Sequence, residues 1–165
     1  MRGLFDLLTA EDLCAKLEHD YERVRANRAD VFAAFDFIVT AWHLVEWRYP
    51  SDAAKTQRSD IRTQYPIVGL CEHLAVGGKH FEPTGKKHQS VKASHRNSAW
   101  KRGAWAPGVW APGVWKDDLV IELAGPAKAA FGDQLTFGQF ADLVMDFWRG
   151  PGGCPGARNV SGSAP

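Results

Sequence analysis

The sequence predicts a mainly α-helical fold, a bundle of four to five helices with a small β-type excursion before the last helix. Three observations predict it. The longest apolar run, residues 31–47, has the composition of a helix buried on several sides. Apolar residues recur at helical spacing on both sides of that run. Between residues 86 and 125 the helical pattern disappears, and Pro-Gly pairs and a short apolar stretch replace it.

The first helix is predicted over Ala10–Asn27. Thr9 and Asp12 have the spacing of a capping box, in which a hydroxyl and an acid satisfy free backbone N–H groups at a helix start. The other face of the segment is charged, so the helix is amphipathic. Its apolar positions recur at helical spacing, at Leu13, Leu17, Tyr21 and Val24.

The central helix is predicted over Val31–Trp47, where Asn27 or Asp30 caps its start and Pro50 stops it. Its polar residues are spaced four, three and three apart, which places them on one face of the helix. This stripe either meets water or holds a buried network. The segment is too short and too polar for a comfortable membrane span, so no membrane association is expected. The stripe consists of Asp36, Thr40, His43 and Glu46.

A polar connector with a short helix near Asp52–Gln57 is expected after the central helix. The apolar spacing then predicts a helix over Ile67–Phe81, with Pro66 in its first turn and Gly77-Gly78 weakening its end. The polar face of this helix carries Glu72, His73, Lys79 and His80.

The excursion contains one predicted strand, Leu119–Leu123, whose partner lies near Gln89–Ala93 or near Lys128–Phe131. Thr136 and Gln139 form a second capping-box pattern, and it opens the last helix. One side of that helix is apolar and faces the core, with Phe140, Val144, Phe147 and Trp148.

These elements predict a single domain over residues 1–149, with 86–125 as a basic, Trp-rich loop or β insertion. Residues 150–165 are rich in Gly, Pro and Ser, and a disordered tail is expected there. Cys14, Cys71 and Cys154 are odd in number and lack zinc-site spacing, so reduced thiols in a cytoplasmic protein are the simplest interpretation. No cofactor is expected.

Charge is distributed unevenly along the chain, although the formal net charge is only +1. Residues 1–78 carry 9 Lys and Arg against 12 Asp and Glu, residues 79–116 carry 8 against 1, and residues 117–165 carry 3 against 6. The basic middle segment also contains four Trp at a spacing of five, and cations with stacking indoles suit single-stranded nucleic acid. Alternatively, the indoles pack on the bundle, or they bind a protein partner or a second copy. The candidate binding residues are Lys86, Lys87, Lys92, Arg96, Lys101, Arg102, Trp100, Trp105, Trp110 and Trp115.

A second candidate site combines His43 and Glu46 of the central helix with His73 and His80 of the later helix. If the two helices pack side by side, a histidine near a carboxylate is suited to acid–base chemistry. The alternative is that these residues cap helices, form structural hydrogen bonds or face solvent. No HExxH or related spacing is present, so no metal site is expected.

Three motifs together suggest a family. AWHLVEW (41–47) is paired with CEHLAVGGKHFE (71–82), and a closing helix ends in DFWR (146–149). The arrangement over about residues 30–149 resembles a group of small bacterial and phage helical proteins, which is similar to the HEPN superfamily of nucleic-acid-associated helical bundles. Catalytic HEPN ribonucleases carry an Arg-x(4–6)-His motif, and this sequence lacks it.

The resemblance implies an accessory or defence-type protein that binds nucleic acid, with RNA as the first candidate. It leaves catalysis open and leaning towards none; an enzyme would be a His-dependent, ribonuclease-like hydrolase. The alternative is a non-enzymatic module for protein–protein interaction or homodimerisation, which would use the Trp-rich surface.

Overall fold

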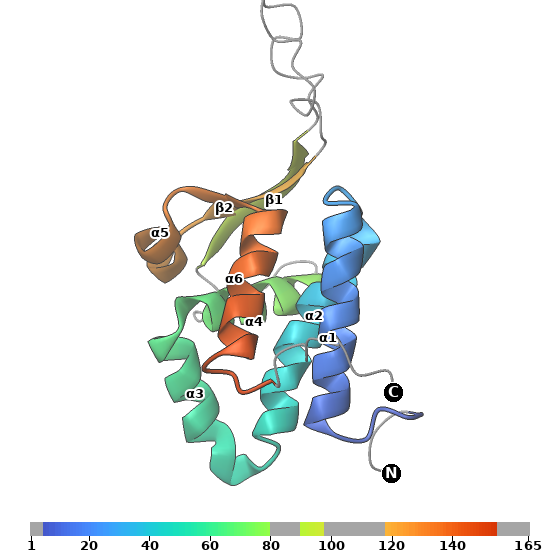
Figure 1. The fold of residues 1–165 in the computed structure, drawn as a ribbon. Helices are drawn as coiled ribbons and strands as arrows, with labels where there is room; N and C mark the ends of the chain where they lie inside the picture. Colours follow the sequence, from blue (N-terminus) through green and yellow to red (C-terminus); the bar gives the residue numbers. More distant parts are fainter. Residues whose placement is uncertain (1–4, 80–89, 98–117, 155–165) are drawn as a thin grey trace, which may run out of the picture.

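The structure is a computed structural model, and it describes residues 5–79, 90–97 and 118–154 (Figure 1). The mainly helical fold is confirmed in these ranges. The helices are α1 (Ala10–Ala26), α2 (Val31–Arg48), α3 (Lys55–Gln64), α4 (Pro66–Lys79), α5 (Gly125–Phe131) and α6 (Phe137–Arg149), with a 3-10 turn η1 (Asp52–Ala54) before α3. The strands are β1 (Val91–Asn97), β2 (Asp118–Leu123) and β3 (Gln134–Thr136).

Helices α1 and α2 lie side by side and begin where the sequence predicts (Figure 1). The capping box at the start of α1 is present, and the N–H groups of Leu8 and Thr9 hold the pKa of Asp12 below its ordinary value. Of the two candidate caps for α2, Asp30 is correct, because its side chain accepts hydrogen bonds from the first free N–H groups of the helix. No helix in the described ranges is long and apolar enough to cross a bilayer.

The connector after α2 is more helical than the sequence predicts, since η1 and α3 fill most of it. None of the residues of α3 is buried, which is why its apolar pattern is weak. Contacts with other elements stabilise it instead. Arg58 donates to the carbonyl of Tyr49, and Arg62 forms an ion pair with Glu72 of α4. Helix α4 begins at Pro66, as predicted.

The sheet lies at one end of the helical bundle (Figure 1). Its strand order is β1-β2-β3, and β1 pairs with β2 in antiparallel fashion from Val91↔Leu123 to Asn97↔Asp118. The predicted partner near Gln89–Ala93 is therefore correct in part, because the pairing begins at Val91 and continues past Ala93 to Asn97, and Gln89 lies outside the described ranges. The other candidate, Lys128–Phe131, is wrong because these residues belong to α5.

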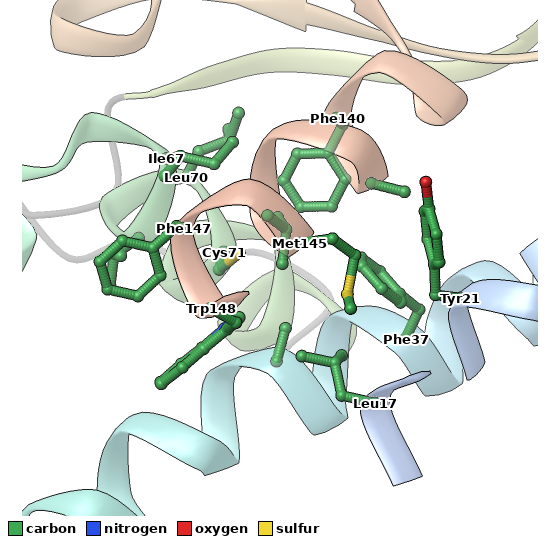
Figure 2. Close-up of a cluster of buried hydrophobic side chains, with 14 of the residues drawn as sticks. Leu17, Tyr21, Phe37, Ile67, Leu70, Cys71, Phe140, Met145, Phe147 and Trp148 are labelled. Atoms are coloured by element: carbon green, nitrogen blue, oxygen red, sulfur yellow. The ribbon is translucent and has the colours of Figure 1, made fainter. Parts of the chain in front are cut away.

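The hydrophobic core is organised around α6, whose side chains lie between α1 and α2 on one side and α4 on the other (Figure 2). Phe37 of α2 is fully buried, and its ring makes edge contacts with the rings of Phe137 and Phe140. All four apolar residues predicted to line the last helix are buried. The central helix is therefore buried where α1 and α4 pack against it, with α6 completing the cover.

The capping box at the start of α6 is also confirmed, since Thr136 and Gln139 each bind the backbone N–H of the other. Thr136→Ala removes the acceptor for one of these N–H groups, and we expect it to lower the free energy of unfolding by about 0.5–2 kcal/mol. Chemical denaturation measures the loss. Thr136→Ser keeps the hydroxyl and should recover most of it; equal losses in both variants would contradict the role of the cap.

Two expectations for the cysteines and the C-terminal residues are wrong. Cys14 and Cys154 form a disulfide instead of being reduced thiols, and Cys71 is the free, buried cysteine of the described residues. The predicted tail is ordered over 150–154, where the chain turns back and the N–H of Cys154 binds the carbonyl of Trp148. Arg48 of α2 donates to the carbonyl of Gly153 and holds this turn. Residues 155–165 lie outside the described ranges.

Candidate functional site

The first half of the polar stripe on α2 belongs to a network between α1 and α2. Thr40 is buried and donates a hydrogen bond of 2.6 Å to the carboxylate of Asp20, which is itself buried. Lys16 binds the same carboxylate, and Arg23 pairs with Asp36 at 2.6 Å. These charged groups neutralise one another within the helix pair, so this part of the stripe is structural.

The second half of the stripe does not join the predicted histidine cluster. His43 and Glu46 are exposed on the C-terminal half of α2. His73 is buried, and its Nδ1 accepts hydrogen bonds from the N–H groups of Ser90 (3.0 Å) and Val91 (3.1 Å). His73 therefore anchors the start of β1, beside the N-terminal half of α2.

A groove of about 680 Å³ lies between the sheet and the facing ends of α2 and α4. Its volume is within the range of ligand sites. Helix α2 contributes four residues of its N-terminal half, and α4 contributes four of its C-terminal half. The lining residues are Val31, Ala34, Phe35 and Ile38 of α2; His73, Leu74, Gly77 and Gly78 of α4; residues 91–96 of β1; residues 119–121 of β2; and Phe137.

Three of the residues that line the groove are basic and exposed. Lys92 and Arg96, both predicted as binding residues, lie on β1 with His95. Arg96 donates to the carbonyl of Ala29 at 2.8 Å, so its side chain reaches from the strand to the α1–α2 connection. Lys92 and His95 lie 3.5 and 3.7 Å from Glu122, which does not line the groove. The described lining holds no Asp or Glu, and the carboxylate beside it, Glu122, is a partner of Lys92 and His95.

The same groove has an aromatic residue that the sequence did not predict as part of a site. Phe35 lines it and is 49% exposed, and the neighbouring Val31 and Phe32 of the same helix are 50% and 81% exposed. The long apolar run predicts burial on several sides, but one face of the first turns of α2 is exposed, while Ala33 and Ala34 on the other face are buried. Exposed large apolar side chains at one place indicate contact with something else.

Cys71 is not a reactive nucleophile, and the described residues form no metal site. Burial raises the pKa of the Cys71 thiol, so the thiol stays protonated and is a poor nucleophile. No group of three His, Cys, Asp or Glu side chains in the described part of the chain could hold a metal ion.

The other predicted site residues lie outside the described ranges. They are His80, Lys86, Lys87, Trp100, Lys101, Arg102, Trp105, Trp110 and Trp115. The resemblance to HEPN domains also stays a prediction. No family model matches the chain, and no curated protein or solved structure matches it significantly.

Proposed function

We propose that this protein binds single-stranded nucleic acid, with RNA as the first candidate, along the groove between β1 and the start of α2, as an HEPN-like accessory or defence-type protein. The observation that carries the proposal is the joint presence of Lys92, Arg96 and the half-exposed ring of Phe35 in a lining whose described residues include no carboxylate. The proposal includes no catalytic step.

Each part of the groove matches one part of the ligand. Lys92 and Arg96 are exposed, and their charges can neutralise phosphates with release of counterions. Phe35 offers an apolar ring surface, which every base can contact whatever its sequence. Binding should therefore depend steeply on salt and only weakly on sequence.

Fluorescence anisotropy of a labelled single-stranded RNA at several salt concentrations tests this function. Replacing Lys92 and Arg96 together with Ala should weaken binding and reduce the slope of log affinity against log salt by about 1.4, because each single-strand phosphate contact contributes about 0.7. Lys55 and Lys128 carry matched charges on α3 and α5 and do not line the groove, so their double Ala variant is the control. Equal slopes in the two variants, with circular dichroism showing both folded, would contradict the assignment.

A second candidate function is a protein-interaction or homodimerisation module, which the exposed Val31, Phe32 and Phe35 favour. Light scattering separates the two. A dimer that resists salt and disappears in Phe32→Ala would favour the module. The roles predicted for Trp105 and Trp110 stay predictions in either case.

A further inference from the structure

The position of the Phe35 ring depends on a glycine of the neighbouring helix. Phe35 of α2 lies directly against Gly78 of α4, where an added Cβ would be 2.9 Å from Cε2 and 3.5 Å from Cδ2 of the ring. Real Cβ atoms essentially never come as close as the first distance. A side chain at position 78 would therefore displace the edge of the ring, and glycine leaves the ring where it is.

Phe35 makes this close contact with Gly78 but does not belong to the hydrophobic core. The core cluster and the partly buried residues that pack against it do not include Phe35. About half of the side chain is exposed, and it borders the groove near Lys92 and Arg96. A ring that is supported by a helix on one side and open to a basic groove on the other is already ordered before a ligand arrives.

Gly78 itself is unfavourable for the helix that contains it. Gly lowers helix stability relative to Ala, yet α4 continues through Gly77 and Gly78 to Lys79. The helix would gain from Ala at position 78, and the ring would have to move. Glycine at position 78 thus leaves room for the ring and lowers the stability of the helix.

We propose that Phe35, positioned by Gly78, is a stacking platform for an unpaired base of the bound strand. The inference rests on the proposed function and specifies it, because it adds that Gly78 holds the Phe35 ring in the position in which one base stacks on it. Lys92 and Arg96 hold the phosphates on the strand side of the groove, while the base lies against the ring on the helix side. Binding then discriminates a strand with bases from a strand of equal charge without them.

The test compares two labelled oligonucleotides of equal length, one with bases and one fully abasic. The intact chain should bind the base-containing strand at least about fivefold more tightly, as expected for one stacked base. Phe35→Ala and Phe35→Leu should reduce this preference by the contribution of one stacked base, about fivefold or more, and leave affinity for the abasic strand unchanged, whereas Phe35→Trp should keep it. Phe32→Ala is the matched control, because Phe32 is more exposed and does not line the groove.

Gly78→Ala tests whether Gly78 positions the ring. If Gly78 served only the stability of the helix, this variant would not change the preference for bases. We expect it to raise or preserve thermal stability and at the same time to reduce the preference for bases. Gly69→Ala in the same helix is its control, since a Cβ there would make only an ordinary contact of 3.5 Å with the carbonyl of Arg62.

The outcomes separate the two proposals. If the intact chain binds neither strand, the proposed function fails, and the stacking platform fails with it. If it binds both strands equally, or if Phe35→Ala keeps the preference, the stacking platform is wrong and phosphate binding by the groove stands.

Discussion

Cys14→Ser is expected to lower the free energy of unfolding by about 2–5 kcal/mol. The disulfide joins residues that are 140 positions apart, so it closes nearly the whole described chain into one loop and restricts the unfolded state strongly. It also fixes the turn after α6 against the first turns of α1, where Arg48 binds it. Denaturant unfolding of the oxidised protein and of the variant measures the difference.

A reducing agent provides the matched control for the disulfide. It should lower the stability of the intact chain to that of Cys14→Ser and leave the Cys14→Ser, Cys154→Ser double variant unchanged. A Cys71→Ala variant should keep the full response to reductant, because Cys71 is free and buried. A stability that does not respond to reductant would contradict the stabilising role of the bond.

Phe37→Ala is expected to lower the free energy of unfolding by about 3–5 kcal/mol. Phe37 is 0% exposed, and its ring lies 6.1–6.3 Å from those of Tyr21, Phe137 and Phe140, measured between centroids. These three rings come from α1 and the start of α6, so the vacated volume lies between α2 and two other helices and cannot collapse easily. Urea unfolding at a fixed pH measures the loss.

Phe32→Ala is the control on the same helix. Phe32 is 81% exposed, so its replacement should change the free energy of unfolding by no more than about 0.5 kcal/mol. Comparable losses in the two variants would mean that α2 is not covered on the face that carries Phe37.

The helices that could be predicted from sequence are those with local signals. Both capping boxes lie within four residues of the helix start that they determine, and α1 and α6 have an apolar face at helical spacing. Helix α3 has no buried residue, and contacts with other elements hold it, among them the ion pair between Arg62 and Glu72 of α4. A spacing pattern within one segment contains no information about that pairing.

The ordered turn at residues 150–154 depends on contacts with residues that are even more distant in the sequence. Composition alone predicted disorder from residue 150, because Gly and Pro there cannot form a core. The segment is held from outside, by Cys14 and by Arg48. Both partners lie more than a hundred positions away in the sequence.

Part of the candidate site could be predicted from the sequence. The rest could not, for the same kind of physical reason as in α3 and the C-terminal turn. Lys92 and Arg96 could be found because charge is visible in the sequence. Phe35 could not, since an apolar run does not show which of its turns another element covers. Helical spacing predicts which face of a helix carries His43 or His73, but it does not show which halves of α2 and α4 meet. Of these two histidines, the groove includes only His73.

The pairing of Asn97 with Asp118 fixes the two ends of residues 98–117 next to each other across the β1–β2 ladder. Those twenty residues include the two consecutive WAPGV units. Because loop-closure entropy grows only with the logarithm of length, gaining or losing one five-residue unit changes it by about 0.2 kcal/mol. One WAPGV unit more or less would therefore change the entropic cost of pairing β1 with β2 by little.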